Sequence, residues 1–86
     1  MSDKTFRMIP NPFTTEFTVS GDRFKEHGIY TIKMYALSGN LVYTDQIKGA
    51  SDGLTITPNI KKTGIYLVSV EDAQGTILVT KRVLKK

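Results

Sequence analysis

The sequence predicts an all-β domain, a β-sandwich of seven antiparallel strands. Three observations predict it: apolar and polar residues alternate with a period of two, β-branched and aromatic residues gather in short runs, and Gly, Asn, Asp and Pro separate these runs. No segment shows a convincing helical period. The predicted strands are Thr5–Ile9, Thr15–Ser20, Ile29–Leu37, Leu41–Lys48, Leu54–Thr57, Ile65–Asp72 and Thr76–Leu84. Seven short strands of this kind are typical of a β-sandwich.

Alternation within the strands predicts which side chains face the core. Side chains at every second position share one side of a strand, so an apolar set of this kind indicates a buried face. In the third strand the apolar set is Tyr30, Ile32, Met34 and Ala36, opposite Thr31, Lys33 and Tyr35, and in the sixth it is Tyr66, Val68 and Val70, opposite Ser69 and Glu71. Each of these strands therefore turns one face to the core.

Two short loops, Ser38–Asn40 and Ala73–Gly75, are predicted to be hairpin turns, because glycine takes positive φ angles without steric cost. The two hairpins resemble each other, since residues 28–44 align without gaps with residues 64–80. A duplication would explain this pattern, and so would equal demands on two equivalent hairpins of a sandwich. Two copies are too few for a solenoid.

Length and composition limit the classes of protein to which the chain can belong. Its 86 residues predict one domain over 1–86, in which residues 1–4 are expected to be vector-derived or the remnant of a linker. The 40% apolar and 23% charged composition indicates a folded globular chain, and the absence of cysteine excludes disulfides and thiolate chemistry. No apolar run approaches the roughly 20 residues that span a bilayer, and none forms a signal peptide after residues 1–4, so no membrane insertion is expected.

Basic residues are concentrated near the C-terminus. Over residues 1–45 five basic and five acidic side chains cancel, whereas residues 46–86 carry seven basic and three acidic ones and account for the net charge of +4. Four of the seven lie in the last six residues: Lys81, Arg82, Lys85 and Lys86. A basic terminus attracts nucleic acid, acidic lipid or acidic protein surfaces, and it also keeps a domain soluble. Charge alone leaves these alternatives open.

Residues that could support catalysis are sparse. The single histidine, His27, lies in a polar segment without the partner that acid–base catalysis or a two-histidine metal site needs. Glu26, Asp52, Glu71 and Asp72 lack the spacing of a calcium loop, although Glu71-Asp72 at a hairpin end could hold a cation weakly. The glycines stand alone at turns, which excludes a phosphate-binding loop. We therefore expect no enzyme, no catalytic residue, no metal site and no cofactor.

A nucleic-acid partner would require the basic terminus to act together with aromatic side chains, such as Tyr35 and Tyr43, that stack on bases. These tyrosines are more simply explained as side chains that cap the core and pair across strands. Half of the chain is neutral and no known RNA-binding or helical recognition motif occurs, so no nucleic-acid partner is expected.

Several short motifs occur in an order that is specific for one family. In chain order they are Pro10-Asn11-Pro12, Phe17-Thr18-Val19, Ile32–Val42 with Gly39 in its turn, Gly64–Val68 with Gly64 and Tyr66, and the basic end Lys81–Lys86. Each proline favours extended backbone in the residue before it, and neither donates to a ladder, so the first motif ends a strand. In this order, from about Phe6 to Lys86, the chain resembles the type A C-terminal sorting domains of the type IX secretion system, also called the Por secretion tail.

The resemblance implies an immunoglobulin-like antiparallel sandwich of seven strands at the C-terminus of a larger Bacteroidetes cargo protein. In that family the domain is a transport signal: the cargo enters the periplasm by a Sec signal at its own N-terminus, and the outer-membrane translocon then recognises the domain. A sortase-like C-terminal signal peptidase commonly removes the domain and can attach the cargo to lipopolysaccharide. The implied partners are the fused cargo, the translocon and the peptidase, and the implied locations are the periplasm in transit and then the cell surface or the medium.

Carried over by position, the recognition residues are Pro10, Asn11, Pro12, Gly39, Gly64, Tyr66, Lys81, Arg82, Lys85 and Lys86. Each of these motifs can also be explained by a role in the fold. The Pro-Asn-Pro motif is expected to shape the first crossing between sheets more than to contact a receptor, Gly64 to supply a turn, and Tyr66 to fill the core with its hydroxyl on the backbone. The basic residues, expected on an edge strand, are the stronger contact candidates. Phe13 stands at a variable position, and Lys81-Arg82 replaces a lysine pair.

One other class of function competes with the sorting signal, namely a fibronectin-like accessory or carbohydrate-binding module of an extracellular enzyme. Such a module would have the same sandwich fold but would need exposed aromatic side chains to bind sugar rings. It would not need to lie at the C-terminus of its protein. The ending Lys85-Lys86 favours the sorting signal.

Overall fold

The structure is a computed structural model that describes residues 6–21, 24, 28–49 and 53–86. The described residues form seven strands and no helix. The strands are β1 (Phe6–Ile9), β2 (Phe17–Gly21), β3 (Ile29–Ala36), β4 (Leu41–Lys48), β5 (Leu54–Ile56), β6 (Gly64–Glu71) and β7 (Ile77–Lys85). Every predicted strand is present, and its ends differ from the prediction by no more than two residues. Within these ranges no helix is long and apolar enough to cross a membrane.

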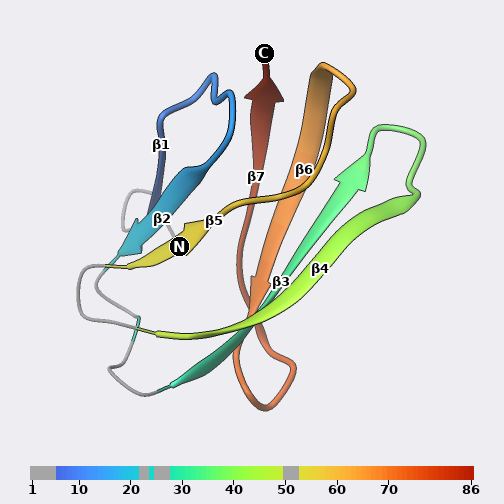
Figure 1. Cartoon of the computed structure of the whole chain (residues 1–86). Coiled ribbons are helices and arrows are strands. Elements are labelled where there is room, and N and C mark those ends of the chain that lie inside the picture. Colours follow the sequence, from blue (N-terminus) through green and yellow to red (C-terminus); the bar gives the residue numbers. More distant parts are fainter. Residues whose placement is uncertain (1–5, 22–23, 25–27, 50–52) are drawn as a thin grey trace.

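The strands form two antiparallel sheets that face each other (Figure 1). One sheet has the order β1-β2-β5, and the other has the order β4-β3-β6-β7, so β1 and β7 are both edge strands. The all-β prediction with seven strands in two antiparallel sheets is confirmed, and the arrangement agrees with a β-sandwich. The immunoglobulin-like connectivity stays a prediction.

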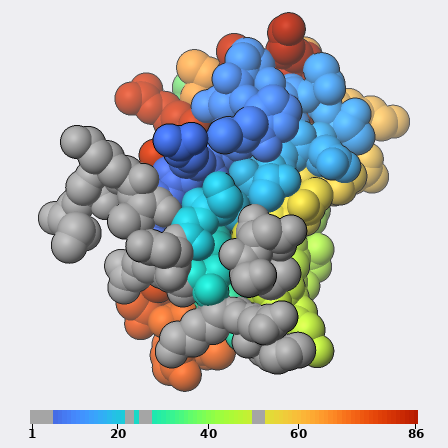
Figure 2. Space-filling view, turned by 90° about the vertical axis from the view of Figure 1, so that its left-hand side faces the viewer, coloured from blue at the N-terminus to red at the C-terminus, as the bar shows by residue number. Residues whose placement is uncertain are grey.

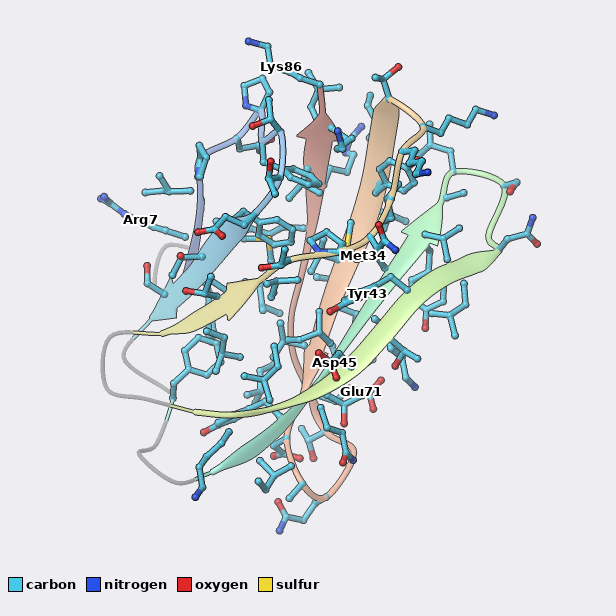
Figure 3. All side chains as sticks on the ribbon, viewed as in Figure 1. Arg7, Met34, Tyr43, Asp45, Glu71 and Lys86 are labelled. Atoms are coloured by element: carbon cyan, nitrogen blue, oxygen red, sulfur yellow. The ribbon has the colours of Figure 1, made fainter. Side chains whose placement is uncertain are left out.

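The core lies between the two sheets, where the alternating apolar faces meet. As predicted, Tyr30, Ile32 and Met34 of β3 are buried, and so are Tyr66, Val68 and Val70 of β6. Ala36, which was expected on the same face, is only half-buried. Figure 3 shows Met34 inside the sandwich. Burial of each large aliphatic side chain stabilises the fold by about 1.5–3 kcal/mol before conformational entropy is subtracted.

Ser69 departs from the predicted alternation, because it lies on the outer face and is nevertheless buried. In the register of the sheet it lies between Lys33 of β3 and Thr80 of β7. The Lys33 ammonium forms an ion pair of 3.1 Å with Glu71, two residues further along β6. The neighbouring side chains therefore cover this small residue on the outer face.

The β3–β4 and β6–β7 hairpins share one turn geometry. In the first, the Ala36 N–H donates to Asn40 and the Gly39 N–H donates to Ala36; in the second, the Asp72 N–H donates to Thr76 and the Gly75 N–H donates to Asp72. Gly39 has a φ of 97° and Gly75 a φ of 84°, the left-handed conformation that such loops require. Both ladders also shift register at equivalent points, after Met34 and after Val70. The predicted hairpin turns are confirmed. The sequence repeat reflects the fact that both hairpins have the same turn geometry and a register shift at the same position.

Candidate functional site

The basic C-terminal residues lie on an edge strand, as predicted. They do not share one face, because side chains alternate along β7. Lys81 and Lys85 lie on the side of the core residue Val83 and are half-buried, whereas Arg82 is exposed on the outer face beside Leu84. The Lys85 ammonium donates a hydrogen bond of 2.7 Å to the main-chain oxygen of Lys86. The four cations therefore surround the end of the strand instead of forming one flat patch.

The Pro-Asn-Pro motif joins the first sheet to this basic end. The side chain of Asn11 acts as a peptide group: its Oδ1 accepts from the Leu84 N–H at 2.9 Å, and its Nδ2 donates to the Arg82 carbonyl at 3.4 Å. Beside it, the Phe13 N–H donates to Leu84 at 2.9 Å, and the Lys86 N–H donates to Phe13 at 2.8 Å. Residues 11–13 thus occupy the outer edge of β7 over its last residues.

Figure 2 shows the segment that follows β1 packed against the C-terminal residues at the upper end of the molecule. Pro10 and Pro12 are exposed, and the peptide bonds that precede them are cis. Proline has no N–H to donate, so the motif cannot extend β1 and instead crosses to the other sheet. This position matches the expected crossing between sheets, and the contact with the basic strand adds a partner that the sequence did not reveal.

Phe13 is the residue of this region that sequence reasoning missed. Its position is expected to be variable in the family, yet its ring is fully buried, and the ring centroids of Phe13 and Phe17 are 4.8 Å apart. An isolated parallel bridge also pairs Phe13 with Lys85. The available signal was the aromatic side chain itself, which a segment of exposed loop seldom carries.

Gly64 and Tyr66 define the start of β6. Tyr66 is buried, and its hydroxyl donates a hydrogen bond of 2.7 Å to the Lys62 carbonyl, which confirms the prediction that it fills the core and bonds to the backbone. A tyrosine that bonds to the main chain a few residues upstream is a recurring feature of immunoglobulin-like sandwiches. Gly64 is the first residue of the strand itself, with a φ of 141°, and not part of a turn as expected. Open space surrounds the position of a Cβ atom, so the backbone conformation alone favours glycine there.

Among the described residues, two pairs of ionisable side chains interact with each other on the strands β3, β4 and β6. The Tyr43 hydroxyl donates a hydrogen bond of 3.2 Å to Asp45 (Figure 3), and burial followed by the Asp45 charge raises the pKa of Tyr43 above 10.0. A hydrogen bond with Glu71 raises the pKa of Lys33 above 10.5. Both pairs join side chains of the strands β3, β4 and β6, so these shifts concern stability.

No metal site occurs among the residues that the structure describes, since no three or more His, Cys, Asp or Glu side chains gather there. His27, Glu26 and Asp52 lie outside the described residues. The eight aromatic residues, in contrast, are all described, and each is buried or half-buried.

Comparison with known families gives one match. The family model described as "Secretion system C-terminal sorting domain" matches residues 7–86, which is nearly the whole chain. No curated protein and no solved structure matches the chain. Domains of this family are sorting signals of type IX secretion and do not form an enzyme family, which implies a cargo on the N-terminal side and export to the cell surface or the medium. The chain belongs to the family of type IX secretion C-terminal sorting domains.

Proposed function

We propose that the end of β7, held in place by residues 11–13, is the part of the sorting signal that the type IX outer-membrane translocon reads. The observation that carries the proposal is the contact between two motifs that lie at opposite ends of the sequence. Asn11 pairs with Arg82 and Leu84, and Phe13 pairs with Leu84 and Lys86. The basic end is therefore presented as an ordered strand and not as a loose tail.

Order at this end favours recognition for a thermodynamic reason. A segment that is already fixed in its bound conformation loses less conformational entropy on binding. The charges of Arg82 and Lys86, which are exposed, also attract an acidic receptor surface and favour correct encounter over wrong partners. In this proposal Pro10, Asn11 and Pro12 act by holding β7 in place. Gly39, Gly64 and Tyr66 shape the sheet to which β7 belongs.

The later steps of the proposal follow the family. The cargo passes through the periplasm, the translocon binds the domain, and a sortase-like peptidase then cleaves before β1 and attaches the cargo to the cell surface. The competing carbohydrate-binding module is disfavoured, because no aromatic residue of the chain is exposed as a sugar platform. The same burial of aromatic rings disfavours base stacking by a nucleic-acid binder.

The test is an export assay in a bacterium that has the type IX machinery, with a fluorescent reporter placed between a Sec signal and this domain. In one variant Lys85→Gln and Lys86→Gln are combined; in its control Arg7→Gln and Lys48→Gln remove two exposed charges elsewhere. We expect the first variant to lower the exported fraction at least fivefold and the control to leave it unchanged. Equal export of both variants and the wild type would contradict recognition of the terminal charges.

A further inference from the structure

A shallow groove lies next to the start of β6, between the β3–β4 hairpin and the segment that leads into β6. Its volume is about 320 Å³, and its lining includes the apolar residues Leu37 and Ile65. Tyr66 also lines the groove, and its hydroxyl donates a hydrogen bond to the carbonyl of Lys62, another lining residue. The groove is therefore built by hydrogen-bonded and strand residues, although its rim is open.

Exposed apolar side chains that are not part of the core lie at this groove. Leu37 is 67% exposed and Ile65 is 42% exposed. Ile65 pairs across the sheet with Leu84 of β7, which is 40% exposed and lies on the same outer face. A contiguous row of exposed aliphatic side chains on a small domain indicates an interaction site, whereas single exposed ones do not.

The surroundings of this row are positively charged. Lys62 lies in the groove wall, Lys61 precedes it, and Arg82 lies on the outer face two residues before Leu84. No acidic residue lines the groove. The acidic residue of the same strand, Glu71, lies at the far end of β6, where Lys33 pairs with it at 3.1 Å. The cations beside the groove therefore have no acidic neighbour in its lining.

We propose that this groove is a second docking site, which binds an acidic aliphatic segment of a protein of the export machinery. The inference rests on the proposed function and adds a surface that lies outside the terminal motif. An aliphatic side chain of the partner fills the space between Leu37 and Ile65, and its carboxylates face Lys62 and Arg82. Charge complementarity selects the partner, while burial of the aliphatic groups supplies the affinity.

The chain offers a closely matched control for each half of this site. Ile29 is 43% exposed, against 42% for Ile65, and both lie on the outer face of the same sheet at opposite ends. Lys48 is exposed, as Lys62 is, and lies opposite Ile29 in the register, so it serves as the control for Lys62. The side chain of Lys62 is replaceable without loss of the Tyr66 hydrogen bond, because that bond uses the carbonyl.

In the export assay described above, Ile65→Thr and Lys62→Glu should each lower the exported fraction at least fivefold, while Ile29→Thr and Lys48→Glu leave it unchanged. The conservative variant Lys62→Arg should be exported as well as the wild type, because it keeps the positive charge. Thermal denaturation of the purified domains checks folding; if Ile65→Thr is unfolded, Leu37→Ser in the hairpin loop replaces it.

Export of the groove variants at the level of their controls would overturn the inference while the wild-type tail remains a functional signal. Failure of the wild-type tail itself to be exported would instead overturn the proposed function, and the groove's role with it. A third outcome concerns the ligand of the groove. If the wild-type domain sediments with phosphatidylglycerol vesicles and the Lys62→Glu variant does not, the groove binds an anionic lipid surface. The proposal of a protein partner would then be wrong.

Discussion

Asn11 accepts a hydrogen bond of 2.9 Å from the main-chain N–H of Leu84, a residue 73 positions later in the chain. With the longer bond from its amide nitrogen to Arg82, this side chain replaces one peptide unit of a neighbouring strand. An exposed strand edge is a template for unwanted pairing, and covering it is one way in which proteins prevent aggregation. The same contact orders the basic end that we propose as the signal.

Replacement of Asn11 by alanine should release this edge. The N–H of Leu84 loses its acceptor at an exposed position, where water substitutes, so the free energy of unfolding should fall by about 0.5–1.5 kcal/mol. Hydrogen exchange at the Leu84 amide should become faster. The Val83 amide should be unaffected, because alternation along an antiparallel strand directs it toward β6.

Asn59→Ala is the control for this variant. Asn59 is also exposed, and its side chain makes no hydrogen bond to the part of the chain that the structure describes. Unchanged exchange at Leu84 in Asn11→Ala would show that the side-chain amide does not hold the strand.

Replacement of Phe13 by alanine should be far more costly. The ring is fully buried against Phe17, so its removal leaves a cavity and should lower the free energy of unfolding by about 3–5 kcal/mol. Urea denaturation monitored by circular dichroism measures this change. A loss below about 1 kcal/mol would place the ring outside the core and contradict the packing.

Two substitutions at Tyr66 separate its ring from its hydroxyl. Tyr66→Phe keeps the ring but leaves the Lys62 carbonyl without its donor, and it should cost about 1–2 kcal/mol of unfolding free energy. Tyr66→Ala should cost roughly 3 kcal/mol or more, because it also empties the core position. Equal denaturation midpoints for the wild type and Tyr66→Phe would indicate that the hydrogen bond contributes nothing.

Alkaline pH should destabilise the domain in part through Tyr43. Burial and the Asp45 charge raise the pKa of Tyr43 above 10.0, so the folded state holds this proton more tightly than the unfolded state. The resulting stability is complete below pH 10 and decreases as the pH rises through the raised pKa. Tyr43→Phe should therefore lose less stability than the wild type between pH 9 and pH 11. Parallel curves of melting temperature against pH for the two proteins would contradict this assignment.

Sequence reasoning succeeded where structure is local. Alternation at a period of two predicted which faces of β3 and β6 are buried, and Gly39 and Gly75 marked both hairpins, because these features depend on neighbours in the chain. It could not predict that Asn11 pairs with Leu84, since a side chain that replaces a strand leaves no periodic pattern.

The other differences have equally physical causes. Phe13 follows two prolines in a segment without alternation, so its aromatic side chain was the one local sign that its ring enters the core. Ser69 is buried on the outer face because of neighbours on other strands, which the alternation of β6 does not reveal. The groove at Leu37 and Ile65 likewise depends on how a hairpin lies beside the start of β6, a relationship that only the folded chain shows.

The most direct test of the central claim is export of a reporter by this domain alone. Residues 1–86, with a native upstream linker, are fused behind a Sec signal and a fluorescent protein, and fluorescence is measured in the periplasm, at the cell surface and in the medium. The comparison strain lacks the type IX translocon. A sorting signal predicts fluorescence at the surface or in the medium of the competent strain only, and its loss when Val83–Lys86 is deleted. Fluorescence that stays in the periplasm of both strains, with a folded tail, would contradict the sorting function.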